Sequence, residues 1–585
     1  MTTTTTAPKA EKKKITQTWK PLFNLLKVSK VPIYHYVIYL VVSMLFGIIY
    51  VLLPSVKAQI IAGEIFDPSL VVTYVAVTLA STLLSFPFSI YAAYISYNTQ
   101  RCLRRTIWSK IVHLGMKDLD EMPPTTLVSR VTTDTTEIDY TLSYVINMVL
   151  FVYYLVSMLA IVGGVNMTMM LMMALLIPCI IIANIPSHFM HNAQYEITNT
   201  NANYTNYLAE HLGSLKQIKA SAAEKKEDAA NDAAAKACFK AKVKMAVLDM
   251  LAQPLIYGMD AVVDGIILIY GGYLLSQGIL STESLLTVYM YGSIIAIYSY
   301  QFVFCWQNVK QTQGGTKAIS EIIMKEPEKM ERERSFDIPD ADISLENVTF
   351  SYNDGEKVLD DVSMTFPKGK VTAIVGPSGS GKTTVLKLLE RLYQPDDGKI
   401  MFGDVEAETI HLNEWRAAFG MVPQSSPLLF GTVRDNITYG VDENVSDGAL
   451  KTAMDAANVT ELVDKMPQGL DTDVGDVGSK LSGGEKQRIA LARMMIRDPE
   501  YLLLDEVTSS LDALNESHVV SALGQLMEGR TTVVVAHNLR TVENADNIIF
   551  LENGKVTGTG THKELYESNA TYKQYVDLQK AGAEA

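Results

Sequence analysis

Residues 376–383 read GPSGSGKT, a glycine-rich stretch that ends in a lysine and a threonine. Small residues let backbone N–H groups come close to phosphate oxygens, so a loop of this kind can cradle a phosphate chain. Lys382 would reach the β- and γ-phosphates, and Thr383 would offer its hydroxyl to Mg²⁺. The loop and the residue after it predict a nucleotide site made of Gly376, Ser378, Gly379, Ser380, Gly381, Lys382, Thr383 and Thr384.

Two acidic residues end the apolar stretch YLLLDE at 501–506. Asp505 suits the water shell of Mg²⁺, and Glu506 suits a general base that aligns water with the γ-phosphorus. A third candidate, His537, ends the apolar stretch TTVVVAH and would sense the γ-phosphate. These residues predict hydrolysis of the bound nucleotide.

The same half of the chain also predicts the strand and the helix that must position these residues. VTAIV at 371–375 predicts a buried strand that runs into the glycine-rich loop, and VLKLLERLY predicts a helix that leaves it. The GxxxxGK[ST] pattern indicates a phosphate-binding loop when a strand precedes it and a helix follows it. This half therefore predicts an α/β P-loop nucleotide-binding domain.

A second anion-binding stretch, LSGGEKQR at 481–488, opens another expected helix. Here the chain resembles the ATP-binding cassette (ABC) family, in which an LSGGQ-type signature closes on the ATP held by a second cassette. The resemblance gives Ser482, Gly483 and Gly484 that role at a helix N-terminus, with Glu485 where glutamine is commoner. One cassette cannot complete a site, so the partner is a second copy (a homodimer is favoured) or a homologous half-transporter.

The remaining motifs of the family follow in order. Tyr352 in FSYNDG resembles the aromatic residue that stacks on adenine, and Gln424 in MVPQSS resembles the glutamine that contacts Mg²⁺. DVGDVG at 473–478 resembles the loop that meets the membrane helices, and SSLD at 509–512 resembles the loop that links the two sites through Asp512. The resemblance covers about 341–580 and implies ATP and Mg²⁺ as cofactors.

The first half of the chain is dominated by apolar segments long enough to cross a bilayer, which takes about 20 residues. Six are predicted, at about 33–55, 69–97, 141–165, 167–190, 247–275 and 283–306. Basic residues gather between the second and third segments and between the fourth and fifth, so both chain ends are expected in the cytoplasm. The bilayer of the cell membrane is therefore an expected partner.

These segments resemble the exporter-type membrane domain of the same family. A turn is expected at Gly163–Asn166, and the segments 127–139 and 207–227 resemble its two inner loops. The expected fold is a six-helix transmembrane domain fused to an α/β P-loop cassette. Its predicted parts are a cytoplasmic tail (1–30), a membrane domain (31–315), a linker (316–340) and the cassette (341–585).

Two carboxylates lie inside the fifth segment. Asp260 and Asp264 are one helical turn apart, and an intramembrane carboxylate costs about 2.5 to 3.5 kcal/mol on insertion scales. They are expected to face a water-filled cavity that attracts a cationic or hydrogen-bonding substrate, or else to cap a helix bend or pair with tyrosines. Tyr298 and Gln301 are candidates for the same cavity, although packing is the favoured interpretation for the tyrosines and methionines of these segments.

Composition excludes some classes of protein. The net charge of −14 argues against a nucleic-acid partner, and the N-terminus has no hydrophobic core of a signal peptide. The predicted function is ATP-driven transport, most simply export of a small molecule, lipid, drug or peptide. The alternatives are siderophore-type uptake through an exporter-like fold, and an ATP-gated channel or regulatory membrane ATPase.

Overall fold

The computed structural model describes residues 20–62, 67–173, 178, 185–328, 330, 341–352, 355–441, 445–475, 478–507, 513–536 and 542–584. The chain forms two compact units. The first, the membrane unit, contains Met1–Leu114 and Met122–Glu326. The second, the cassette unit, contains Gly115–Glu121 and Pro327–Ala585.

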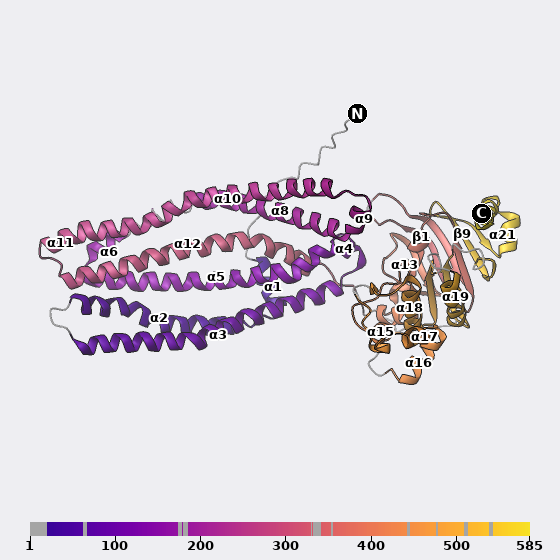
Figure 1. Ribbon diagram of the computed structural model, residues 1–585, viewed down its shortest axis with the longest axis horizontal. Coiled ribbons are helices and arrows are strands. Elements are labelled where there is room, and N and C mark those ends of the chain that lie inside the picture. Colours follow the sequence, from indigo (N-terminus) through magenta and orange to yellow (C-terminus); the bar gives the residue numbers. More distant parts are fainter. Residues whose placement is uncertain are drawn as a thin grey trace, which may run out of the picture. The chain divides into compact units, whose positions relative to one another are not determined.

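The membrane unit is built from long helices that run side by side (Figure 1). Helix α12 packs against α5 and α2, and α8 packs against α10. The helices are α1 (Lys20–Val28), α2 (Ile33–Ala62), α3 (Pro68–Val112), α5 (Pro124–Val165), α6 (Met167–Met173), α8 (Ile185–Gly213), α9 (Leu215–Ala220), α10 (Glu224–Ile266), a π turn (Ile267–Gly271), α11 (Gly272–Ser276) and α12 (Thr282–Met324).

Four of the six predicted spans are confirmed as helices long and apolar enough to cross a membrane: Ile33–Ala62, Pro68–Val112, Pro124–Val165 and Thr282–Val309. The predicted span 167–190 falls partly on residues outside the described ranges. The predicted span 247–275 is helical along its backbone, through the π turn, but several of its side chains are also outside the description. The count of six therefore stays a prediction.

The turn between α5 and α6 lies later than expected. Both Gly163 and Gly164 are still helical, and α5 ends at Val165. The side-chain oxygen of Asn166 accepts hydrogen bonds from the N–H groups of Thr168 (3.0 Å) and Met169 (3.1 Å), which caps α6. Gly163 serves packing here, because a Cβ at this position would lie 2.8 Å from the Met170 sulfur.

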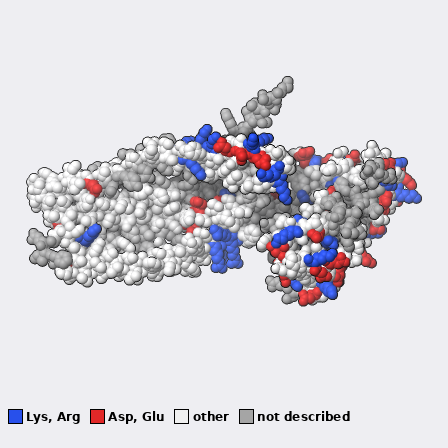
Figure 2. Space-filling view, in the orientation of Figure 1, with Lys and Arg blue, Asp and Glu red and all other residues white. Residues whose placement is uncertain are grey.

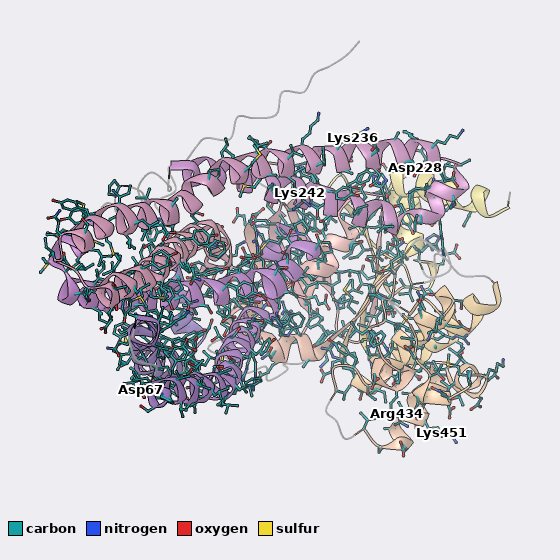
Figure 3. The ribbon with its side chains drawn as sticks, turned by 60° about the vertical axis from the view of Figure 1, so that its left-hand side comes forward. Asp67, Asp228, Lys236, Lys242, Arg434 and Lys451 are labelled. Atoms are coloured by element: carbon teal, nitrogen blue, oxygen red, sulfur yellow. The ribbon has the colours of Figure 1, made fainter. Side chains whose placement is uncertain are left out.

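Charge is unevenly distributed along the membrane unit. Asp67 caps α3 at one end of the helices, whereas Asp228, Lys236 and Lys242 lie on the part of α10 toward the other end (Figure 3). Figure 2 shows a surface with few charges at the Asp67 end and clusters of both signs toward the other. Many apolar side chains of α2 and α3 are exposed, which is expected of helices that face lipid.

The cassette unit contains two sheets. The six-stranded sheet has the order β10-β9-β3-β8-β7-β6 and the four-stranded sheet the order β2-β1-β4-β5. The strands are β1 (Ile343–Phe350), β2 (Leu359–Phe366), β3 (Val371–Val375), β4 (Asp397–Phe402), β5 (Val405–Glu406), β6 (Phe419–Val422), β7 (Tyr501–Asp505), β8 (Thr531–Val535), β9 (Asn547–Glu552) and β10 (Lys555–Gly560).

The helices of this unit surround the larger sheet. They are α4 (Met116–Asp120), α13 (Lys382–Leu389), α14 (Leu412–Ala418), α15 (Val433–Ile437), α16 (Asp447–Ala456), α17 (Thr460–Asp464), α18 (Gly483–Arg497), α19 (Ala513–Met527), α21 (His562–Ser568) and α22 (Ala570–Glu584), with 3₁₀ turns at Ala407–Thr409 and Gly469–Asp471. Strands β3, β6, β7 and β8 are parallel, so their carboxyl ends meet at one edge.

Hydrophobic cores cover both faces of the larger sheet. Along β7, Leu502 and Leu504 belong to one core while Tyr501 and Leu503 belong to the other. A parallel strand buried on both faces is apolar at nearly every position, which explains why the strand before each functional loop is mostly apolar.

The short helix α4 groups with the cassette unit, although it connects α3 to α5 of the membrane unit. The segment 127–139, which resembles the first inner loop of the family, is an uninterrupted part of α5. Gly115 stands at the start of α4, and Pro123 and Pro124 start α5, so backbone breakers on both sides isolate α4. The second predicted inner loop, 207–227, contains α9 between α8 and α10.

Helix α12 continues to Met324, so the first part of the expected linker is helical. Pro327 follows shortly after, and a proline disfavours helical backbone at the residue before it. The Glu328 side chain then pairs with Arg416 through two contacts of 2.9 Å, within the cassette unit.

Candidate functional site

The glycine-rich loop joins β3 to α13, as the sequence predicts. A Cβ on Gly376 would lie 1.9 Å from the backbone oxygen of Leu551, so no larger residue fits there. Gly379 and Gly381 have φ angles of 82° and 102°, which favour glycine. Nothing lies within 4 Å of a Cβ built on Gly379, so the turn of the loop is accessible to a ligand.

Lys382 is buried at the start of α13. Its Nζ donates hydrogen bonds to the carbonyl oxygens of Gly376 (3.0 Å) and Pro377 (2.9 Å), which holds the ammonium inside the loop. Burial lowers the pKa of Lys382, while the nearby Glu506 and Asp505 carboxylates oppose the shift. A cation held in this way is suited to bind a phosphate group.

Ser380 supplies a test of whether the loop fits a nucleotide. Its side-chain oxygen is buried and has no hydrogen-bond partner in the part of the chain that the structure describes. Buried hydroxyl groups are normally paired, and this one lies between two glycines in the loop. Together with the Lys382 ammonium, it fits a phosphate oxygen. Ser378 is exposed on the same loop.

Thr383 lies after the loop that follows β3, and Asp505 is the last residue of β7. Their side chains are in contact. The Thr383 hydroxyl donates a hydrogen bond to Asp505 Oδ1 at 3.3 Å. Burial raises the pKa of Asp505, and the hydrogen bond from Thr383 opposes this shift. A hydroxyl and a carboxylate at one point form part of the oxygen ligand set that Mg²⁺ prefers, the rest of which a nucleotide and water would provide.

Gln424 and Glu506 also meet. The Gln424 side-chain amide donates a hydrogen bond to Glu506 Oε2 at 2.7 Å. The two residues follow β6 and β7, which are adjacent parallel strands, so the sheet brings their side chains to one place. Glu506 has a φ of 47°, uncommon for a residue other than glycine, and its N–H donates to the Val535 carbonyl at 3.1 Å. Such backbone strain is often found at active sites.

Tyr352 lies beside the same helix as Lys382. Its hydroxyl is 3.1 Å from the hydroxyl of Thr384. Its ring meets the rings of Phe350 and Tyr393 edge to face, at centroid distances of 5.0 and 5.2 Å. Aromatic pairs of this geometry stabilise each other, so Tyr352 is braced on two sides.

Tyr393 was not found from the sequence as a site residue. Its hydroxyl donates a hydrogen bond to Asp120 of α4, and burial together with this hydrogen bond raises the pKa of Tyr393. Met116 of α4 packs against the same hydrophobic core as Tyr393. Only the ring contact with Tyr352 reveals Tyr393, since no spacing in the sequence links residues so far apart.

The second anion-binding stretch starts α18. The Ser482 side chain accepts a hydrogen bond from the Glu485 N–H (3.4 Å), and the Glu485 carboxylate accepts one from the Ser482 N–H (2.7 Å). This is a capping box, which glutamate and glutamine can both complete, so the departure from the LSGGQ pattern preserves the local structure. Gly483 and Gly484 form the first turn.

The signature stretch is separate from the loop of its own chain. Within the described residues, Ser482, Gly483 and Gly484 have no hydrogen bond to 376–384. Two predicted site residues, His537 and Asp512, lie outside the described residues, as does part of the 473–478 loop.

Three of the four candidates for a substrate cavity have described side chains, and no hydrogen bond or ring contact joins these three to one another. Asp264 Oδ1 is buried and has no hydrogen-bond partner among the described residues, and the π turn Ile267–Gly271 begins three residues later. Tyr298 packs its ring against Phe151 and Tyr154 of α5, and Gln301 is half-buried on α12. The side chain of Asp260 lies outside the described part.

Comparison with known proteins gives a consistent result for both units. Residues 359–509 match the family described as ABC transporter, and residues 36–297 match the ABC transporter transmembrane region. The chain is 32% identical over 571 residues to a multidrug resistance ABC transporter ATP-binding and permease protein of Lactococcus lactis subsp. cremoris, which covers 96% of both chains.

Other relatives extend this pattern. An ATP-dependent lipid A-core flippase of Burkholderia thailandensis is 30% identical over 510 residues, covering 85% of this chain and 84% of the relative. Among solved structures, a bacterial Atm1-family ABC exporter with ATP bound has a TM-score of 0.78 at 24% identity, and the match covers 94% of this chain and 98% of that one. At this identity, the structural match shows the fold.

Proposed function

This chain belongs to the ABC transporter family as an exporter-type half-transporter that couples ATP hydrolysis to transport, and we propose that two copies of it export an amphiphilic molecule. The observation that carries the ATP-driven part of this proposal is the contact of Gln424 with Glu506 beside the Thr383–Asp505 pair. The four side chains come from three different loops at one edge of the sheet.

The residues of the site have distinct roles in the proposed reaction. Tyr352 stacks on adenine, and the loop Gly376–Thr383 with Thr384 binds the phosphates. Thr383, Gln424 and Asp505 would hold Mg²⁺, which would supply positive charge to the phosphates when bound. Glu506 accepts a proton from the attacking water, and its hydrogen bond with Gln424 orients the carboxylate for this task. His537 senses the γ-phosphate.

A second cassette completes each site. Half-transporters of this family work as dimers, and each signature, with Ser482, Gly483, Gly484 and Glu485, would close on the ATP of the other cassette while Asp512 links the two sites. We favour a homodimer over a pair with a homologous half-transporter, because the described site residues of this cassette are all of the types that ATP binding and hydrolysis require. Closure would be transmitted through α4 and α9.

The relatives bear on the direction of transport and the kind of substrate. A multidrug resistance transporter and a lipid A-core flippase are named among them, and neither name favours uptake. We infer that the substrate is a small amphiphile or a lipid, which is moved from the cytoplasmic side. In this proposal both ends of the chain lie in the cytoplasm. The membrane domain is 31–315 and the cassette is 341–585. Asp260, Asp264, Tyr298 and Gln301 would line its pathway.

The proposal can be tested in inside-out membrane vesicles that contain the full chain. An extract of the source cells is added with ATP, and the vesicle contents are followed by mass spectrometry, with Glu506→Gln vesicles as the control. Accumulation of a compound only in vesicles with the unaltered protein supports export. Loss of a preloaded compound on addition of ATP would overturn the direction, and ATP hydrolysis with no movement of any compound would favour a channel or a regulatory ATPase.

A further inference from the structure

A carboxylate is fully buried in the membrane unit, between α2, α3 and α5. Asp139 of α5 has no exposed surface. Its oxygens accept hydrogen bonds from the hydroxyls of Ser96 and Tyr36 and from the amide of Gln100. A buried charge usually has an oppositely charged partner, so the surroundings of this residue are unusual.

Asp139 has no such partner among the described residues. No Lys, Arg or His nitrogen lies within 4 Å of it there. The nearest cation in the same network, Arg104, donates instead to Gln100 (3.3 Å) and to Thr135 (3.3 Å). The three hydrogen bonds come from neutral groups, so no positive charge among the described residues faces the Asp139 carboxyl group.

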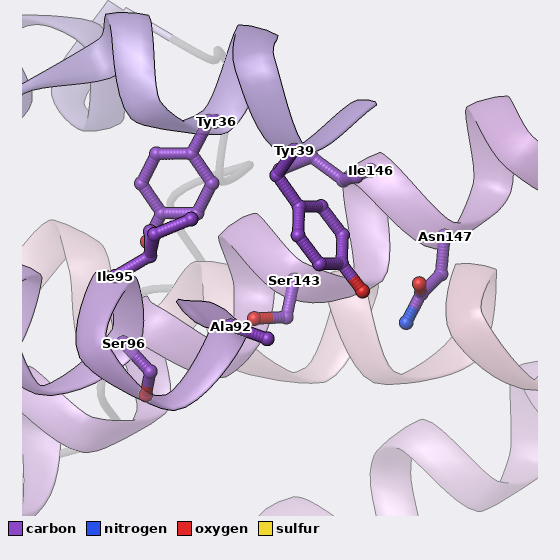
Figure 4. Close-up of a pocket in the computed structure, with 8 residues that line it drawn as sticks. All are labelled: Tyr36, Tyr39, Ala92, Ile95, Ser96, Ser143, Ile146 and Asn147. Carbon is purple, nitrogen blue, oxygen red and sulfur yellow. The ribbon is translucent and has the colours of Figure 1, made fainter. Parts of the chain in front are cut away.

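A cavity of about 70 Å³ lies against this network. Tyr36 and Ser96 line the cavity and also contact Asp139. Three further polar side chains, Tyr39, Ser143 and Asn147, complete its polar lining. Figure 4 shows the Tyr39 hydroxyl pointing toward the Asn147 side chain. A water molecule needs about 10–15 Å³ of such volume, so the cavity has room for one small polar group.

The cavity lies near the charged end of the helices. Asp139 is about 40 Å from Val165 at the far end of α5, at a rise of about 1.5 Å per residue, and the hydrocarbon core is about 30 Å thick. In the orientation that the proposed function assumes, this depth corresponds to the headgroups of the cytoplasmic leaflet. A molecule that enters from that leaflet would meet the cavity before it reached the centre of the bilayer.

We propose that this cavity is an entry subsite for the alkylammonium group of a cationic amphiphile, a proposal that rests on the proposed export function. The hydroxyl and amide oxygens of Tyr39, Ser143 and Asn147 can accept hydrogen bonds from an ammonium group. The faces of aromatic rings attract cations, and Asp139 supplies the negative charge behind them. Ile95 and Ile146 give the apolar wall that the adjoining carbon chain requires.

The experiment uses the full-length protein in liposomes of phosphatidylglycerol. ATP hydrolysis is titrated with dodecylammonium, whose N–H groups can donate hydrogen bonds, and with uncharged dodecyl maltoside, and the half-maximal concentration of each probe is recorded. In the unaltered protein, the cationic probe acts at lower concentration than the uncharged one. Asp139→Asn raises the half-maximal concentration of the cationic probe about tenfold, the loss expected when one charge-assisted interaction is removed, and leaves that of dodecyl maltoside unchanged.

Matched variants separate this role from a structural one. Asp134→Asn makes the same chemical change on the same helix, where the carboxylate pairs with Arg130 outside the cavity, and it should leave both titrations unchanged. Asn147→Leu changes the cavity without touching Asp139, so it tests the subsite even if Asp139→Asn fails to fold. It should also raise the half-maximal concentration of the cationic probe alone.

The outcomes also distinguish failure of the subsite from failure of the proposed function. Equal half-maximal concentrations for the two probes in the unaltered protein, or equal effects of Asn147→Leu on both, overturn the subsite. Absence of any ATP hydrolysis in the unaltered protein overturns the proposed function itself. Adding phosphatidylethanolamine identifies the source of the ammonium group. A lipid headgroup that enters the cavity raises the half-maximal concentration of dodecylammonium in the unaltered protein and not in Asn147→Leu.

Discussion

The hydroxyl of Tyr393 donates a hydrogen bond to Asp120, which ties the short helix α4 to the aromatic ring that braces Tyr352. We predict that Tyr393→Leu raises the KM for ATP about two- to tenfold with little change in kcat, because an aromatic pair contributes about 0.5–1.5 kcal/mol beyond its buried area. Tyr393→Phe keeps the ring and should leave KM unchanged, but reduce the stimulation of hydrolysis by transported substrate. Steady-state kinetics with and without substrate measures both effects.

The cassette offers a matched control for this hydrogen bond. The Tyr566 hydroxyl donates to Asp577 at 2.7 Å, between α21 and α22, and neither residue is among those proposed to bind the nucleotide. Tyr566→Phe should therefore leave both KM and substrate stimulation unchanged. If Tyr393→Phe behaves like Tyr566→Phe, the contact between α4 and Tyr393 has no role in coupling.

Glu506 should be essential for hydrolysis but not for ATP binding. Glu506→Gln keeps the length of the side chain and removes its basicity, so kcat should fall by about 10²–10⁴-fold while the dimer closes around ATP. Trapped nucleotide and a single-turnover assay measure the two effects. Glu500→Gln, an exposed glutamate just before β7, is the control. Unchanged turnover in Glu506→Gln would remove Glu506 from the reaction.

The capping box at the start of α18 gives a prediction about stability. Glu485→Gln should preserve the box, since both side chains can accept the hydrogen bond from the Ser482 N–H. Glu485→Ala should lower the free energy of unfolding of the cassette by about 0.3–1.5 kcal/mol. Urea unfolding of the full chain, followed by a probe in the cassette, compares them. Equal losses in the two variants would mean that the charge of Glu485, and not the box, stabilises the helix.

Asp264 gives a prediction for the membrane unit, where its buried Oδ1 has no described partner. If it contacts substrate, the double variant Asp260→Asn plus Asp264→Asn should reduce the ratio of substrate-stimulated to basal ATP hydrolysis. The amides keep the side-chain shape and remove both charges, so a change reflects charge. Asp67→Asn, at the end of α3, provides the control. Full stimulation in the double variant would return both residues to the helix-capping interpretation.

The nucleotide loops could be predicted from the sequence because each consists of consecutive residues at the end of an apolar strand. The contacts of Gln424 with Glu506 and of Thr383 with Asp505 follow once the parallel order of the strands is known. Tyr393 with Asp120, and Asp139 with Tyr36, could not be predicted in this way, because each contact joins helices or loops that only tertiary packing brings together. The resemblance of 127–139 to an inner loop of the family stays a prediction, because the structure shows only that this segment is a helical part of α5.

Glu390 gives a prediction that depends on pH. Burial raises the pKa of this carboxyl, and attraction to Arg416 and Arg497 opposes the shift without reversing it. A carboxyl group with a raised pKa in the folded state contributes stability below its unfolded pKa of about 4.3, and this contribution is lost as the pH rises through the folded pKa. Glu390→Gln, which has the same shape and no charge, should therefore gain stability relative to the unaltered protein between pH 4 and pH 8. Urea midpoints at a series of pH values measure the difference. A variant that becomes less stable than the unaltered protein toward pH 8 would mean that the two arginines outweigh burial, and that Glu390 acts as an ion-pair partner in the cassette.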